Sequence, residues 1–212
     1  SDSGDAMKKD DNTTKQRLID AGIELFGKYG YAAVSTKQIS EYSGINSALV
    51  SYHFGGKEKF YHAVIRGITD ELIDWFQSQP HVQLDTGNLS LTELREHLKV
   101  SLEHFYAWFY SLHGACGTNM FFREIISQEH PDTNTEFARA AAFITPYMYN
   151  LLTSYYTKIG KPEVKVSFIW IVLISVVQNI SLHSNAPEEA QQAFRDAQIS
   201  ENILDLILNK YA

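Results

Sequence analysis

Two short helical patterns separated by one glycine constrain this chain more than any other feature of its sequence. They lie in the stretch 34–60, which reads VSTKQISEYSGINSALVSYHFGGKEKF. Gly44, in the hinge Ser43-Gly44-Ile45, ends the first pattern, and Gly55-Gly56 ends the second. Helices this short, joined this tightly, favour a helix-turn-helix arrangement.

The residues of both short helices support this interpretation. Thr36 offers a hydroxyl as N-cap of the first helix, and Ile39 and Tyr42 supply its inward face. Asn46 or Ser47 can cap the second helix. A helix that reads the major groove needs short or hydrogen-bonding outward side chains. The second helix offers Ser47, Ala48, Ser51, Tyr52 and His53. The alternative is a helical corner whose polar residues face water.

Three residues at helix starts are candidates for phosphate contacts. Thr36 and Lys37 open the first short helix, and Lys57 opens the helix after the motif. A backbone N–H, a hydroxyl and a positive charge can each bind a phosphate at such a position. We therefore expect Thr36, Lys37 and Lys57 to position the motif on a DNA backbone.

Apolar residues recur at helical spacing from Leu18 to Tyr29, which predicts a helix from about Thr14 to a stop at Gly30. We expect residues 1–12 to be a disordered tail, because they are rich in Ser, Asp and Lys. With 12 Gly and 5 Pro in 212 residues, and no alternating strand pattern, we expect an all-α protein of about nine helices.

Six helices are expected beyond the motif. They run from Lys57 to Gln79-Pro80, 94–112, about 120–127 after an interruption at 114–117, 135–160 with a kink or break at Pro146, 164–182, and from Pro187 onward. The segment 81–90 between the first two is expected to be a surface loop. We expect an N-terminal three-helix DNA-binding domain at 13–58, then a larger helical effector-binding and dimerisation domain at 59–212.

At this point the sequence resembles the TetR family of one-component transcriptional regulators. The resemblance rests on Leu25-Phe26, Gly30, Thr36, Ile39, Gly44-Ile45 and Phe54-x-x-Lys57-Glu58, about a quarter of the chain. The family pattern Tyr-x-Tyr-Phe is replaced here by 51–54, Ser-Tyr-His-Phe. This replacement puts the DNA contacts of Ser51 and His53 in doubt.

The resemblance implies an all-α homodimer whose last two helices form a four-helix bundle with their twins. Such a two-fold dimer would place its recognition helices about 34 Å apart and read a palindromic operator in double-stranded DNA. Repression is the usual mode of the family. The apolar window 164–182 and the face of Ile199, Ile203, Leu206 and Ile207 could supply the dimer surface, or could be monomer core.

Charge is distributed in agreement with this division of roles. Residues 12–60 carry six cations and four anions, whereas residues 61–212 carry ten cations and seventeen anions. The net charge of −7 therefore belongs to the larger C-terminal part. The alternative function is a dimeric small-molecule-binding or interaction protein whose helix-turn-helix no longer reads DNA.

Aromatic residues interspersed with polar groups in the C-terminal part predict a pocket for a small organic effector. A ligand that binds the two dimer states unequally would then release the operator. An aromatic stripe can also be simple core. The candidate ligand residues are His104, Tyr106, Phe109, Tyr110, Met120, Arg123, Tyr147, Tyr155 and Gln178. The run 122–125, Phe-Arg-Glu-Ile, with Pro131 resembles the CecR-like branch, whose members respond to antibiotics.

The sequence gives less support to two other functional classes, an enzyme and a metal-binding protein. Cys116 near His113 could be a thiol and its base, but no orienting group is visible, so we expect no enzyme and no catalytic residues. Glu93, His97 and His104 have metal-compatible spacing, but buried histidines usually form hydrogen bonds, so we expect no metal and no cofactor. One cysteine excludes an internal disulfide, and polar residues in 164–182 argue against a membrane span. We expect a cytoplasmic protein.

Overall fold

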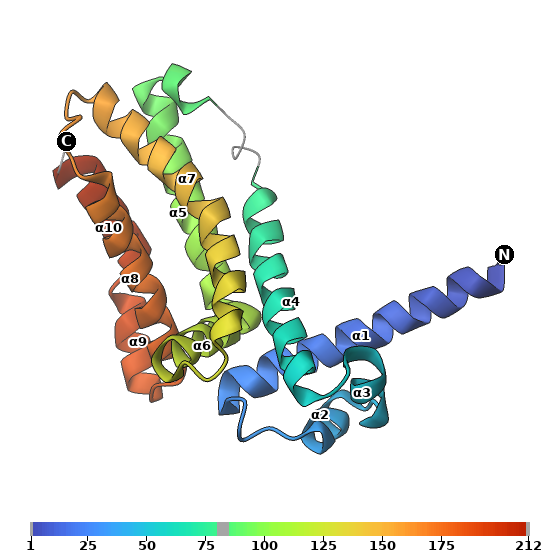
Figure 1. Ribbon diagram of the computed structural model, residues 1–212. Coiled ribbons are helices and arrows are strands. Elements are labelled where there is room, and N and C mark those ends of the chain that lie inside the picture. Colours follow the sequence, from blue (N-terminus) through green and yellow to red (C-terminus); the bar gives the residue numbers. More distant parts are fainter. Residues whose placement is uncertain (1, 80–84, 211–212) are drawn as a thin grey trace. The chain divides into compact units, whose positions relative to one another are not determined.

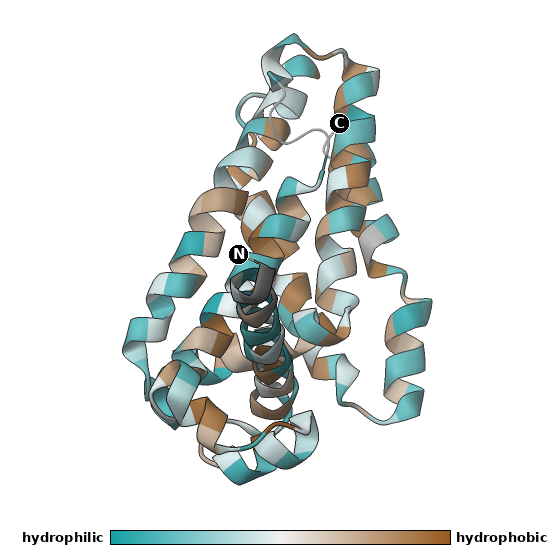
Figure 2. Ribbon diagram, turned by 90° about the vertical axis from the view of Figure 1, so that its right-hand side faces the viewer, coloured by the Kyte–Doolittle hydropathy of each residue, from teal (hydrophilic) through white to brown (hydrophobic). Residues whose placement is uncertain are grey.

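A computed structural model describes residues 2–79 and 85–210, and every element in those residues is helical (Figure 1). The all-α prediction is therefore confirmed. The chain divides into two compact units. The first unit comprises Ser1–Asp70 and Cys116–Phe137, and the second comprises Glu71–Ala115 and Ala138–Ala212. Hydrophilic and hydrophobic residues are interspersed along the helices (Figure 2), as amphipathic packing requires.

The first unit is built on a long N-terminal helix. It contains α1 (Asp2–Tyr29), α2 (Thr36–Ser43), α3 (Ala48–Phe54) and the first part of α4 (Lys57–Gln77). Most of α6 (Leu112–Ser127), the 3-10 turn η2 (Pro131–Thr133) and the start of α7 (Asn134–Lys158) complete it. The apolar side chains at its centre are fully buried: Leu18, Ile23, Phe26, Ile39, Val50, Phe60 and Val64.

Helix α1 begins earlier than expected. The sequence predicted a start near Thr14 after a disordered tail, but the helix runs from Asp2, and its first turns extend beyond α2 and α3 (Figure 1). Residues 2–13 contain no proline, and an Asp11–Lys15 ion pair at 3.1 Å joins them to the next turn. Ser1 lies outside the described residues. The predicted stop is confirmed, because Gly30 follows Tyr29 with a φ of 82°.

The predicted interruption at 114–117 is wrong, because α6 starts at Leu112 and continues through both glycines to Ser127. Gly114 is explained by close packing. A Cβ built on it would lie 1.8 Å from the carbonyl oxygen of Trp108, within the second unit. Its N–H also donates to the Ser111 hydroxyl oxygen at 3.1 Å. This glycine therefore permits a tight turn into the helix instead of ending one.

Helices α1 and α6 approach closely inside the first unit. A Cβ built on Gly27 of α1 would lie 2.4 Å from the Cβ of Cys116 and 2.8 Å from its Cα. Real Cβ atoms do not occur at such distances from other carbons, so any side chain here would push the helices apart. Gly27 therefore sets the distance between the two helices.

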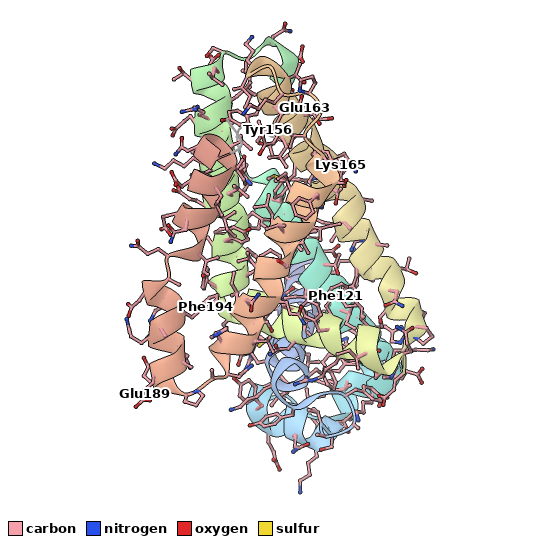
Figure 3. The ribbon with its side chains drawn as sticks, turned by 90° about the vertical axis from the view of Figure 1, so that its left-hand side faces the viewer. Phe121, Tyr156, Glu163, Lys165, Glu189 and Phe194 are labelled. Atoms are coloured by element: carbon pink, nitrogen blue, oxygen red, sulfur yellow. The ribbon has the colours of Figure 1, made fainter. Side chains whose placement is uncertain are left out.

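The second unit contains the rest of α4, η1 (Thr86–Asn88), α5 (Leu91–Tyr110), most of α7, α8 (Val166–Ser184), α9 (Glu188–Asp196), α10 (Ile199–Asp205) and η3 (Leu206–Lys210). Helix α5 packs against α8 and α10. The Tyr156 hydroxyl on α7 donates to the carbonyl of Ile207 at 3.5 Å. Phe194 on α9 stacks on His183 with ring centroids 4.2 Å apart; Tyr156 and Phe194 are labelled in Figure 3.

Two expectations in this unit need correction. A kink or a break was expected at Pro146; helix α7 continues through Pro146, so the break is absent. The single helix expected after Pro187 is divided into α9 and α10 at Gln198, whose backbone is left-handed with a φ of 46°. Of the expected loop 81–90, residues 81–84 lie outside the described residues, and 86–88 form η1.

We predict that Gly27→Ala destabilises the first unit by about 1–3 kcal/mol, because the added Cβ overpacks the contact between α1 and α6. The matched control is Gly4→Ala, since a Cβ on Gly4 of the same helix would have no neighbour within 4 Å. Thermal unfolding followed by circular dichroism measures both variants. If Gly27→Ala unfolds at the same temperature as the wild type, the two helices are not held this closely.

Candidate nucleic-acid interface

Ser35 caps α2. Its hydroxyl accepts the backbone N–H of Gln38 at 3.2 Å, and the Gln38 side-chain oxygen accepts the Ser35 N–H at 2.8 Å. This reciprocal pair is a capping box. Thr36, the expected cap, is instead the first residue inside the helix. Ser35 has the extended backbone that an N-cap residue requires, with φ −101° and ψ 159°.

The C-terminus of α2 is joined to α1. Arg17 of α1 donates from Nη2 to the carbonyl of Ser43 at 2.9 Å, and Gly44 follows with a φ of 71°. A guanidinium on the last carbonyls of a helix stabilises its negative end. Tyr42 does not face inward as expected; it is 57% exposed, and its hydroxyl donates to Glu24 of α1. Arg17 and Tyr42 thus both join α2 to α1.

Asn46 caps the start of α3. Its side-chain oxygen accepts the Ala48 N–H at 2.9 Å, whereas Ser47 makes no side-chain cap. Val50 is fully buried and anchors the helix. Ala48, Ser51 and Tyr52 are exposed, and their spacing places them on one face of the helix. The Tyr52 side chain is 78% exposed, which is unusual for so large a ring.

His53 is not free to point outward as expected. Its side chain is only 5% exposed, and its Nδ1 lies 3.4 Å from a carboxylate oxygen of Asp11 on α1. The ring also makes an edge contact with Tyr52, with centroids 4.9 Å apart. His53 therefore supports Tyr52 and joins α3 to the extended part of α1.

The expected phosphate-binding residues differ in exposure. Lys37 is 85% exposed, with only a 3.9 Å ion pair to Glu41 on the same helix. Thr36 is half-buried at the start of α2. Lys57 instead lies over the ring of Tyr31, 4.1 Å from its centroid, and partial burial lowers the pKa of its ammonium. Lys37 is thus the most accessible of the three.

The first unit therefore assembles part of the predicted site. Ala48, Ser51 and Tyr52 form one exposed face of α3, with Ser47 half-buried at its start. Ser35 and Arg17 were missed, although the Ser-x-x-Gln spacing of 35–38 is the sequence signal of a capping box. Arg17 gave no such signal, because its partner is a carbonyl 26 residues away.

The candidate ligand residues are divided between the two units. In the second unit, three hydroxyls are already used: Tyr106 donates to the carbonyl of Leu173, Tyr155 donates to that of Leu208, and Tyr147 bonds Ser101. His104 stacks on Trp75 with centroids 4.5 Å apart, Phe109 is buried, and Tyr110 and Gln178 are exposed. Met120 and Arg123 belong to the first unit.

The candidate thiol is buried, and His113, Glu93 and His104 have structural partners. Burial raises the pKa of Cys116 to about 11, so the thiol keeps its proton at neutral pH. His113 bonds Glu71 at 2.8 Å. The Glu93 carboxylate accepts the Ser90 N–H in a capping box, and His104 bonds the carbonyl of Trp75. Within residues 2–79 and 85–210, no group of three or more His, Cys, Asp or Glu could hold a metal ion.

We predict that Ser35→Ala lowers the free energy of unfolding of the first unit by about 0.5–2 kcal/mol, because the Gln38 N–H loses its acceptor. Ser35→Asn is the control, since an Asn side chain can accept the same N–H. Urea unfolding measures both variants. Equal losses in the two would contradict a capping role for the hydroxyl.

Comparison with known proteins agrees with the helix-turn-helix geometry. Residues 18–64 match the family described as bacterial regulatory proteins, tetR family. The HTH-type transcriptional dual regulator CecR of Shigella flexneri is 36% identical over 78 residues, which are 37% of this chain and 34% of CecR. This chain thus spans about a third of the length of the curated relatives that it matches.

The fold has solved counterparts over nearly the whole chain. The fatty acid degradation regulator FadR of Bacillus halodurans has a TM-score of 0.65 at 15% identity, covering 92% of this chain and 94% of that one. FadR of Bacillus subtilis, solved in complex with stearoyl-CoA, has a TM-score of 0.64 at 14% identity, with coverage of 92% and 97%. Residues 18–64 are thus similar to the DNA-binding domain of the tetR family, and nearly the whole chain shares its fold with these solved regulators.

Proposed function

We propose that this protein is a ligand-responsive transcriptional regulator that binds double-stranded DNA through α3. The observation that carries the proposal is the exposed face of Ala48, Ser51 and Tyr52, held outward by the buried Val50. A small residue allows close approach to the base edges, and the hydroxyls of Ser51 and Tyr52 can donate or accept hydrogen bonds there. In this proposal α3 is the recognition helix.

Phosphate contacts would position the recognition helix. The exposed Lys37 ammonium, whose ion pair with Glu41 is long and exposed, and the N-terminus of α2 are suited to this role, because a positive charge and helix N–H groups both attract phosphate. Thr36 can add its hydroxyl. Lys57 would have to leave the Tyr31 ring to reach a phosphate, and the Ser47 hydroxyl is only partly accessible. His53 would act on DNA through Tyr52, since its ring is turned to Asp11.

The proposal includes a homodimer formed through the last helices. Helix α8 carries exposed apolar side chains at helical spacing: Phe168, Ile171, Val172 and Leu182. Such a stripe on a helix is suited to burial against a two-fold copy. Within the residues described, α8 is also the one helix long and apolar enough to cross a membrane. We favour the dimer because Leu173, Val176 and Ile180 are buried on the other face of the same helix.

A small organic effector would act through the C-terminal part of the chain. We keep residues 13–58 as the DNA-binding domain and 59–212 as the effector-binding and dimerisation domain, although the compact first unit also includes Cys116–Phe137. The FadR of Bacillus subtilis was solved with stearoyl-CoA, so long-chain acyl-CoA is the first effector class to test. We propose a cytoplasmic repressor that such an effector releases from a palindromic operator.

We predict that the protein enriches a palindromic site from a random duplex pool, and that Tyr52→Ala weakens binding to that site by about 1–3 kcal/mol through lost groove contacts. Tyr110→Ala is the control, since Tyr110 is an exposed tyrosine of the second unit. Retention on nonspecific DNA at low salt is measured in parallel. Absence of enrichment and of low-salt retention would instead support a dimeric binding protein that no longer reads DNA.

We predict that Ile171→Glu converts the dimer to a monomer, because a carboxylate would be buried in the apolar α8 interface. Leu112→Glu is the matched control: Ile171 and Leu112 are 65% and 62% exposed, but Leu112 lies outside α8. Light scattering after size-exclusion chromatography gives the mass of each variant. If the wild type is monomeric, or if Ile171→Glu stays dimeric, the α8 interface is wrong.

A further inference from the structure

The first unit contains a cavity of about 360 Å³ next to the DNA-binding helices. Its walls come from the end of α1, the loop 30–33, Tyr61 of α4 and the C-terminal half of α6. This volume is within the range of small-molecule sites. The cavity is close to α2 along the chain, because the loop 30–33 that forms one wall is followed almost directly by Ser35, the N-cap of α2.

Aromatic rings form much of the wall. Phe26, Tyr31 and Tyr61 contact one another, with centroids 5.0–6.1 Å apart, and Tyr29 adds a fourth, half-exposed ring. The face of an aromatic ring carries negative partial charge and attracts cations. Two lysines already use rings of this wall: Lys57 lies 4.1 Å from the centroid of Tyr31, and Lys28 lies 5.2 Å from that of Tyr29.

The guanidinium on the wall is committed to the fold. Arg123 of α6 donates to the carbonyl of Phe26 at 2.7 Å and to that of Lys28 at 3.0 Å. It therefore closes the C-terminal end of α1, where a positive charge is stabilising. An anionic ligand would have to compete with these two carbonyls for the guanidinium.

One of the two carboxylates on the wall is committed in the same way. Glu124 is buried and accepts hydrogen bonds from the Tyr61 hydroxyl at 2.6 Å, the His130 N–H at 3.0 Å and the His130 ring Nδ1 at 2.9 Å. Burial and the adjacent Glu124 raise the pKa of the Tyr61 phenol, so it remains a donor at neutral pH. Glu124 has little capacity left for a ligand.

The carboxylate of Glu129, unlike the charged groups of Arg123 and Glu124, is not committed to the fold. It lines the cavity, its residue is exposed, and its side chain has no ion-pair or hydrogen-bond partner among the residues that the structure describes. With Arg123 and Glu124 engaged elsewhere, Glu129 is the carboxylate of the wall that is left for a ligand. A ligand cation would have to compete with the Lys28 and Lys57 ammonium groups for the rings of Tyr29 and Tyr31. The cavity thus combines ring faces with one available carboxylate.

We propose that this cavity binds a small organic cation, such as an amine or quaternary ammonium group on a compact apolar body. The ammonium would lie between the aromatic rings and Glu129, and the apolar body would contact Met120 and the rings. The site includes Met120 and Arg123, two of the candidate ligand residues, whereas the other candidates belong to the second unit. A cation bound here would contact the end of α1 and the loop that precedes α2.

Isothermal titration of the 212-residue protein with benzyltrimethylammonium tests this site in the absence of DNA, so its outcome is independent of the proposed function. We expect saturable binding at least about tenfold tighter than that of benzyl alcohol or phenylacetate, because only the cation gains both the ring faces and the carboxylate. No saturable binding of the cation, or equal binding of phenylacetate, would overturn the proposal.

Three variants locate the bound cation. Glu129→Gln removes the charge and Tyr29→Ala removes one ring, and both positions are exposed enough to change without loss of the fold. We expect each to weaken binding by about threefold to tenfold. Glu163→Gln, in the loop between α7 and α8 (Figure 3), is the control and should leave binding unchanged. Binding that survives both cavity variants would place the cation elsewhere and contradict the proposal.

Discussion

The close contact between α1 and α6 at Gly27 and Cys116 is the constraint on which the first unit depends. It makes a segment about ninety positions away in the sequence part of the N-terminal unit. Only because α6 lies this close can Arg123 reach the last carbonyls of α1 and Glu124 reach Tyr61. The orientation of α1, from which α2 and α3 are held, is therefore determined partly by α6.

The exposed face of α3 follows from contacts made by its neighbours. A seven-residue helix is not stable alone, so its position must come from caps and tertiary contacts. Asn46 caps its start, Val50 anchors its inner side, and His53 is held by Asp11. Arg17 holds the end of the preceding helix. The outer side chains are consequently presented on a rigid element, as sequence-specific contacts require.

Much of the fold could be predicted from sequence, because hydrophobic periodicity and glycine stops act locally. The stops at Gly30, Gly44 and Gly55 were predicted and are present. The expectation that Gly114 interrupts a helix was wrong, because the role of this glycine depends on its close approach to the Trp108 carbonyl. The inward turn of His53 depends on Asp11, 42 positions away. Contacts between distant segments leave no periodic signal, so the cavity behind Tyr31 was not predicted either.

In the proposed complex, two copies of α3 enter the major groove on one face of DNA. Methylation-protection footprinting at guanine N7 on an operator selected from the random pool tests it most directly, because N7 lies in the major groove. We expect two protected major-groove patches related by two-fold symmetry and about 34 Å apart, one helical turn. A single protected patch, or protection confined to the minor groove, would contradict it.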